Sequence, residues 1–191
     1  MKMRRSLLSL VALGVAAPTI AQAHPGLHMH GFAEGLAHPL TGLDHLLAMI
    51  AVGFWAASLG GRARWIVPAA FVSVMAGGAL AGAVGLPALA IEYLIAASVV
   101  ALGLLIAFEV RIPTAPAAAL VGLFALAHGY AHGAEAPAGQ GFLAFAVGFI
   151  ASTALLHGVG LGLGALSLAG LTRRIAGFAM ATAGVFLAAF A

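Results

Sequence analysis

The amino-acid sequence predicts an all-α membrane protein, a compact bundle of six transmembrane helices that follows a cleavable signal peptide. Two properties of the whole chain point to this class. Of its 191 residues, 63% are hydrophobic and only 7% are charged, and the mean hydropathy is +1.14. Soluble domains carry about 25% charged residues, so this composition cannot cover a surface that faces water. Helices satisfy their own backbone hydrogen bonds, which makes them the expected structure for such a chain in lipid.

The first 23 residues have the layout of a secretory signal peptide. Three basic residues within the first five positions precede a short apolar run, and the small-residue sequence Ala-Gln-Ala closes the segment. The run is too short to span a bilayer with ease. We therefore expect cleavage after residue 23, with an uncleaved signal anchor as the alternative. Residues 24–38 would then form a short histidine-containing segment outside the membrane, and residues 39–191 the transmembrane domain.

Six apolar segments follow, each close to the ~20 residues that a helix needs to cross a bilayer. The expected spans are residues 39–59, 65–86, 88–108, 115–133, 142–168 and 175–191. Glycine repeats inside them, such as Gly78-x-x-x-Gly82 and Gly160-x-x-x-Gly164, allow helices to approach closely. We expect these repeats to pack helices within one bundle, in preference to forming a dimer interface.

The basic residues predict the orientation of the spans. All five that remain after signal cleavage lie in the first, third and fifth links: Arg62, Arg64, Arg111, Arg173 and Arg174. An excess of Lys and Arg marks the cytoplasmic side, so both termini of the mature chain are expected outside.

The mature chain has five basic and five acidic residues, so its charge does not indicate nucleic acid. The absence of cysteine excludes disulfides and thiolate metal sites. The sequence has no phosphate-loop motif, so no ATPase function or subunit is evident.

Titratable residues of three spans are expected at the outer face. They are His38, Asp44 and His45 of the first span, Glu92 of the third, and His128, His132 and Glu135 of the fourth. A charge at the bilayer centre costs roughly 2.5–3.5 kcal/mol on insertion scales, so their convergence indicates a polar site. We interpret it as a metal site in preference to a set of hydrogen-bonded core histidines.

The spacing in the fourth span suits a metal ion. His128 and His132 are four residues apart, so on a helix they share one face and can bind one ion. Glu135 continues that face if the helix extends past Gly133.

In the first span, His38 precedes Pro39, which disfavours helical geometry at His38 and predicts a bend at the helix start. His38 and His45 are seven residues apart and would share one side of a regular helix. Asp44 would point elsewhere, so it is either a direct ligand or a partner that orients one.

Further candidates are weaker. Met49 could offer a thioether, although packing is the favoured role. His157 lies deeper, in the fifth span, and is either a second station on an ion path or a structural histidine that Thr153 could hydrogen-bond. The N-terminal histidines could capture metal weakly or simply belong to a solvated tail; they are His24, His28 and His30.

Two strings resemble signatures of the HupE/UreJ family of bacterial membrane proteins. "HPLTGLDHLLAM", residues 38–49, is similar to H-P-x-x-G-x-D-H-x-x-A-M, and "HGYAHGAE", residues 128–135, to H-G-x-A-H-G-x-E. The resemblance implies a secondary permease in the bacterial inner membrane that transports Ni²⁺, or Co²⁺, and is associated with hydrogenase or urease maturation. It implies a transported ion and no prosthetic group. The transport residues it implies are His38, Asp44, His45, His128, His132 and Glu135.

The residue chemistry alone is less specific. Nitrogen and oxygen donors without thiolate suit Ni²⁺, Co²⁺, Zn²⁺ or Fe²⁺. Inward movement from the periplasm is expected, and uniport and proton-coupled transport both remain open, as does the oligomeric state. The alternative is a membrane-embedded zinc-type hydrolase, since three ligands beside a carboxylate also describe a catalytic site. No H-E-x-x-H or G-x-S-x-G motif is present, so we expect no enzyme. A bis-histidine haem protein is disfavoured because the histidines gather at one face.

Overall fold

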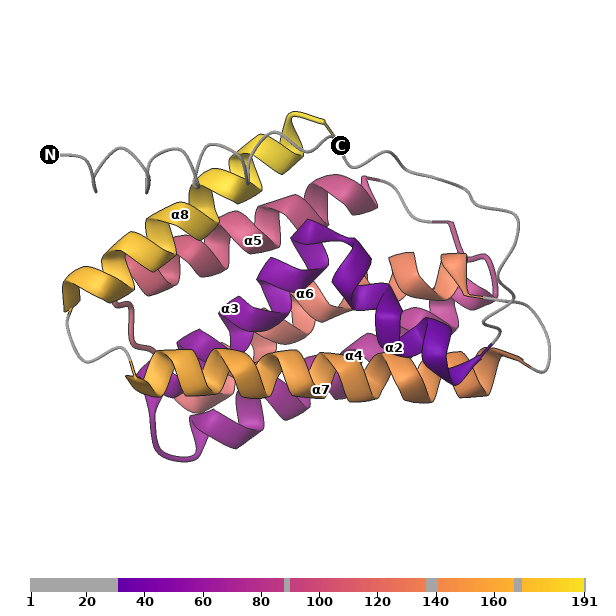
Figure 1. Cartoon of the computed structure of the whole chain (residues 1–191), viewed down its shortest axis with the longest axis horizontal. Coiled ribbons are helices and arrows are strands. Elements are labelled where there is room, and N and C mark those ends of the chain that lie inside the picture. The colour runs from indigo at the N-terminus through magenta and orange to yellow at the C-terminus, as the bar shows by residue number, and fades with distance from the viewer. Residues whose placement is uncertain (1–30, 88–89, 137–140, 167–169, 191) are drawn as a thin grey trace, which may run out of the picture.

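Seven helices make up the part of the chain that the computed structural model describes, residues 31–87, 90–136, 141–166 and 170–190 (Figure 1). They are α2 (Phe32–Thr41), α3 (Leu43–Leu59), α4 (Ala63–Ala83), α5 (Ile91–Ala107), α6 (Thr114–Glu135), α7 (Phe142–Leu166) and α8 (Gly170–Ala188). The predicted all-α class is confirmed. The expected signal peptide, His24, His28 and His30 lie outside the described residues.

Each of the six expected apolar segments coincides with one helix or, for the first, with a pair. Helices α4, α6, α7 and α8 are each long and apolar enough to cross a membrane. Helices α2 and α3 pass the same test only together, and they are bent by 88° at the break between them. Helix α5 has 17 residues, the lower limit for a span. Within the described residues the structure thus gives four candidate spans, or five with the bent pair, and six spans stays a prediction.

The start of the bundle differs from expectation. Helix α2 begins at Phe32, before the expected start at residue 39, and includes both His38 and Pro39. The expectation of non-helical geometry at His38 is therefore wrong. The cause is tertiary: Gly35 of α2 packs against the backbone of Phe145, which holds this segment on α7 as a helix. Pro39 lies inside the last turn of α2, which ends two residues later at Thr41.

The bend falls at Gly42, whose backbone is extended with φ −99° and ψ 117°. Because the chain turns here, His38 and His45 do not share one side of a continuous helix, and that expectation is also wrong. A Cβ at position 42 would lie 2.9 Å from Asp44 Oδ1 and 3.0 Å from His45 Nδ1. The corner is therefore packed directly against polar side chains of α3.

Glycine seams hold the helices in closely packed pairs. Between α4 and α6 the seam consists of Gly78, Gly82, Gly129 and Gly133, and a Cβ on any of them would come within 2.5 Å of a carbonyl oxygen of the other helix. Gly160 and Gly164 of α7 make a similar seam with α3, to which Gly53 of α3 contributes. The prediction that these repeats pack helices within the bundle is confirmed.

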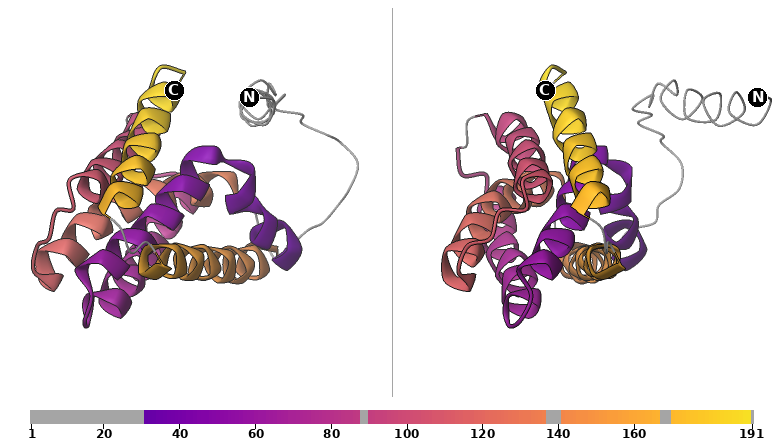
Figure 2. Two further views of the ribbon diagram at one scale, coloured as in Figure 1. Left: turned by 60° about the vertical axis from the view of Figure 1, so that its left-hand side comes forward. Right: turned by 90° about the vertical axis from the view of Figure 1, so that its left-hand side faces the viewer.

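Helices α5 and α8 form a third pair, which lies side by side in both views of Figure 2. Gly103 and Gly177 face each other across it. At the same end of the bundle, Arg174 of α8 forms an ion pair with Glu109 over 3.4 Å. Trp55 Nε1 of α3 donates to Val110 O at 3.0 Å, which ties the end of α3 to the link between α5 and α6. We call this end, where the links with Arg62, Arg64, Arg111, Arg173 and Arg174 lie, the basic end of the protein.

Candidate metal centre

Three potential ligands meet where the end of α6 lies beside α2. His38 Nε2 is 3.0 Å from Glu135 Oε2, and His132 supplies the third donor, with one ligand atom of each residue within 4.8 Å of the others. We call His38, His132 and Glu135 the outer cluster. Burial is graded across it: the side chain of Glu135 is 61% exposed, that of His38 is 24% exposed, and His132 is buried. An ion could therefore reach the cluster from the surface.

The extension of α6 past Gly133 produces this geometry. Because α6 ends at Glu135, its carboxylate lies on the same helix as His132, as the spacing predicts. His38 joins from 97 residues away in the sequence. The strings of residues 38–49 and 128–135 are thus distant in the sequence but adjacent in space.

A row of imidazoles continues from the outer cluster into the bundle. The ring of His132 lies 4.9 Å from that of His38 and 4.2 Å from that of His45, measured between centroids. The ring of His45 in turn lies 4.9 Å from that of His128. His128 is fully buried. Four imidazoles therefore form a continuous series of edge contacts from the partly exposed His38 inward.

Asp44 contacts His45. Its Oδ1 accepts the backbone N–H of His45 at 2.7 Å and lies 2.7 Å from His45 Nδ1. A carboxylate can only accept, so Nδ1 carries the proton and Nε2 keeps its electron pair. That Nε2 is buried and has no hydrogen-bond partner within the described part of the chain. Of the two roles considered for Asp44, this contact favours orientation of a ligand.

His128 has a partner that sequence reasoning missed. Its Nε2 lies 2.9 Å from the hydroxyl of Ser98, a fully buried residue of α5. The spacing within one helix cannot reveal a contact between two helices. A lone serine inside an apolar span was the only available signal.

His157 lies farther along the interior. It is buried on α7, and the ring of Phe71 links it to His128, with centroid distances of 5.2 Å and 5.6 Å. The hydrogen bond that Thr153 could make to His157 is not formed, because the Thr153 hydroxyl faces Met75 Sδ on α4 at 4.0 Å. Both ring nitrogens of His157 are buried without a partner among the described residues, as are both of His132.

Glu92 and Met49 lie outside the outer cluster. Glu92 lines an open hollow of about 340 Å³ between the start of α5 and the end of α6, and Glu135 lines the same hollow. Tyr130 borders it and donates a hydrogen bond to Leu86 O. The side chain of Met49 is completely buried in the hydrophobic core, as the packing role predicts.

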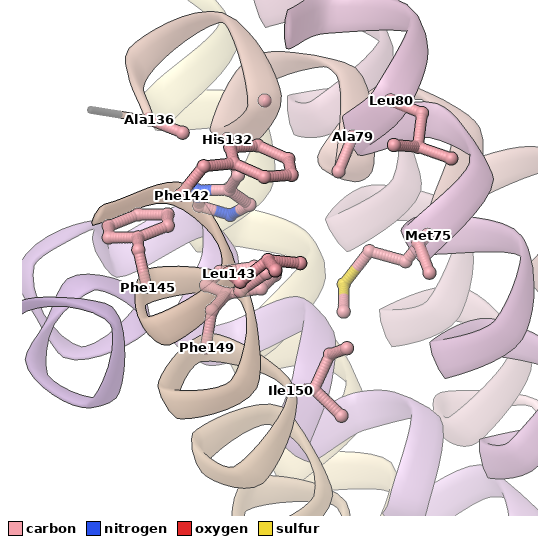
Figure 3. A pocket seen from close by; sticks show the side chains of 13 residues that line it. Met75, Ala79, Leu80, His132, Ala136, Phe142, Leu143, Phe145, Phe149 and Ile150 are labelled. Carbon is pink, nitrogen blue, oxygen red and sulfur yellow. The ribbon is translucent and has the colours of Figure 1, made fainter. Parts of the chain in front are cut away.

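An apolar cavity lies on the other side of His132. It has a volume of about 200 Å³ and opens between α4, α6 and α7 (Figure 3). Its lining includes Met75, Phe142, Phe149 and Ile150, and His132 is the titratable member. His132 therefore separates a polar cluster from an apolar space. This favours the imidazole row, and not the cavity, as the route for a charged species.

The fold and the site together define a helical membrane protein with potential metal ligands gathered at one end. A family model described as HupE / UreJ protein matches residues 10–187, so the chain belongs to the HupE/UreJ family. The chain is 50% identical over 188 residues to Protein HupE of Rhizobium leguminosarum bv. viciae, and the match covers 97% of this chain and 98% of that protein. No solved structure matches the chain. The family is of the transporter type and not an enzyme family, and this chain is a multi-pass membrane protein.

Proposed function

We propose that the protein is a secondary transporter that moves Ni²⁺, or Co²⁺, from the periplasm to the cytoplasm and supplies hydrogenase or urease maturation. Membership of the HupE/UreJ family supports a transport role. One observation supports the path: the outer cluster passes into the buried rings of His45 and His128, and each of these rings has one nitrogen without a hydrogen-bond partner in the described structure. Buried polar groups are normally hydrogen-bonded, so such nitrogens suit an ion that passes and does not stay.

The proposed topology has six spans in the inner membrane, with both mature termini in the periplasm. Arg111 precedes α6 and Glu135 ends it, and a 22-residue helix is about 33 Å long. The outer cluster and the basic end therefore lie on opposite sides of a bilayer-sized distance. Basic residues mark the cytoplasmic side, which supports a periplasmic position for the outer cluster. The bent pair α2–α3 and the short α5 would then each count as one span.

The proposed path begins at the carboxylates. Glu92 and Glu135 would attract a divalent cation to the hollow that they share. His38 and His132 would replace part of its water shell. The ion would then move along His45 and His128 and leave towards the basic end past His157. The N-terminal histidines could deliver ions to this site.

The energetics do not require ATP. Moving two charges down a potential of ~100 mV releases roughly 4.6 kcal/mol. At about 1.4 kcal/mol per decade this corresponds to a concentration ratio above a thousandfold. A uniporter would suffice, and proton exchange through the imidazoles remains compatible with the same residues.

The donor set is compatible with nickel. Imidazole nitrogens and carboxylate oxygens without thiolate suit Ni²⁺ and Co²⁺, and zinc and ferrous iron as well. The choice of nickel rests on the family. Two imidazoles and one carboxylate also form the ligand set of some catalytic zinc sites, which keeps the hydrolase as the competing function.

The test is uptake of radioactive nickel at nanomolar concentration by cells that lack their own nickel uptake. Wild type should accumulate nickel, His132→Ala should not, and Glu109→Gln should behave as wild type because Glu109 lies at the opposite end. Membrane levels of each variant are measured by immunoblot. No uptake by well-inserted wild type would refute nickel transport. A zinc ion retained stoichiometrically through chelation and purification would then favour the hydrolase.

A further inference from the structure

The Ser98 hydroxyl lies between two acceptor-capable groups. Its Oγ is 2.7 Å from Ile95 O, one turn earlier in α5, and 2.9 Å from His128 Nε2 on α6. Ser98 and His128 are both completely buried. Water therefore does not compete for either contact, and the protons must be assigned among these groups alone.

The hydrogen of the Ser98 hydroxyl decides which group donates in each of the two contacts. A serine hydroxyl has a single hydrogen to donate. Two oxygens at 2.7 Å without a hydrogen between them would place electron pairs against each other, so this hydrogen lies on the Ser98–Ile95 contact. The contact with His128 then requires an N–H on the ring, and Ser98 accepts from Nε2. A neutral imidazole has one N–H, which leaves an electron pair on Nδ1.

The free nitrogen is available for a ligand. His128 Nδ1 is buried and lacks a hydrogen-bond partner among the residues that the structure describes. The neighbouring rings are those of His45, at 4.9 Å, and Phe71, at 5.6 Å. The His45 ring is fixed in the opposite tautomer by Asp44, with Nε2 as the free nitrogen. Two adjacent rings thus each keep one electron pair unoccupied inside the bundle.

We propose that Ser98 is a positioning residue that accepts a hydrogen bond from Nε2–H of His128 and so presents the Nδ1 electron pair of that ring to the metal ion in transit. The proposal rests on the proposed transport function. Partners of this kind fix the tautomer and orientation of a ligating histidine, and their loss typically costs about 10–100-fold in metal affinity or activity.

The position of His128 determines which transport parameter changes. The outer cluster, which captures the ion, does not include His128. Ser98→Ala should therefore leave the half-saturating nickel concentration unchanged and lower the maximal uptake rate about tenfold or more. Ser98→Thr keeps the hydroxyl, which in a helix can still bond the carbonyl one turn earlier, and should restore the rate.

The decisive experiment reads the tautomer directly. The full-length chain, labelled with ¹⁵N-histidine and held in lipid nanodiscs without metal, is measured by long-range ¹H–¹⁵N NMR, and the His128 signals are assigned by their loss in His128→Gln. Wild type and Ser98→Thr should show the proton on Nε2. Ser98→Ala should show a mixture of tautomers or the proton on Nδ1. Ser58→Ala is the matched control, because Ser58 makes the same type of intrahelical bond, to Phe54 O at 3.1 Å, without a histidine partner.

A His128 proton on Nδ1 in wild type, or an unchanged tautomer in Ser98→Ala, would overturn the proposal. So would a changed tautomer with a wild-type uptake rate. If Ser98→Ala does not fold, the wild-type spectrum alone still decides between the two tautomers. The spectrum needs no transport, so a failure of the proposed function, seen as absent uptake by wild type, is distinguishable from a failure of this assignment.

Discussion

Two adjacent glycines of α4 provide a test of how tightly the site depends on helix packing. A Cβ added at Gly78 would lie 2.5 Å from Leu126 O and 3.1 Å from Tyr130 N, both on α6. A Cβ added at Gly77 would meet nothing within 4 Å. The substitutions Gly78→Ala and Gly77→Ala therefore add the same methyl group to consecutive residues of one helix, and only one of them affects the α4–α6 seam.

The expected effect can be worked from these distances. Real Cβ atoms essentially never come closer than 3.0 Å to another heavy atom, so Gly78→Ala must move α6 by at least 0.5 Å relative to α4. The contact is with backbone, so no side chain can rotate away. Such overpacking typically costs about 1–3 kcal/mol. A binding site generally tolerates displacements of only ~0.5 Å. His128 lies on α6 between the two contacts.

The assay compares both variants with wild type. Thermal unfolding in detergent should show a lower midpoint for Gly78→Ala, and nickel uptake per inserted molecule should fall. Gly77→Ala should match wild type in uptake and be equally or more stable, because alanine is favoured over glycine in helices by about 1 kcal/mol. Wild-type stability and uptake in Gly78→Ala would refute the reasoning. Equal damage in both variants would also refute it.

Three other predictions concern polar residues. Asp44→Asn should reduce nickel uptake to background without loss of inserted protein, because an uncharged amide holds the His45 ring less firmly; wild-type uptake would remove Asp44 from the site. Glu135→Gln should raise the half-saturating nickel concentration about tenfold or more, because even the loss of a residue that only orients a ligand typically lowers metal affinity about 10–100-fold. An unchanged half-saturating concentration would contradict capture at the outer cluster. Arg174→Ala breaks the partly exposed ion pair with Glu109. It should change the unfolding free energy by less than about 1 kcal/mol and leave nickel uptake unchanged. Reduced uptake would give this end a direct role.

Much of the fold could be predicted from the sequence because it depends on local composition. Apolar segments of sufficient length and the links between them predicted most helix bounds to within a few residues, and the start of α2 at Phe32 is the exception. The alignment of His132 and Glu135 also followed from helix periodicity alone. These features depend on one segment at a time, and neighbouring helices do not alter them.

The errors concern features that depend on two segments. The helical state of His38 results from packing of Gly35 on α7, which overrides the preference of a residue before proline. Thr153 is correctly spaced to reach His157, yet its hydroxyl faces Met75 on another helix. The contact between Ser98 and His128 likewise crosses from α5 to α6. Spacing along one helix contains no information on such pairs.

The two sequence strings combine donor residues with residues that allow backbones to approach. On α6, His128 and His132 alternate with Gly129 and Gly133, and residues one position apart differ by about 100° around a helix. The glycines contact α4 while the histidines contact α3, so closing the seam brings the donors to His45.

Gly42 likewise brings the donor residues of the first string, residues 38–49, into position. It forms the corner between α2 and α3, and any side chain there would meet the carboxylate of Asp44. The corner brings His38 to Glu135, while the start of α3 places His45 beside His132. A straight helix through position 42 would carry His38 and His45 on one side, seven residues apart. His38 could then not contact Glu135 while His45 lies beside His132. The glycines are therefore as necessary to the site as the donors, because they set the distances over which those donors act.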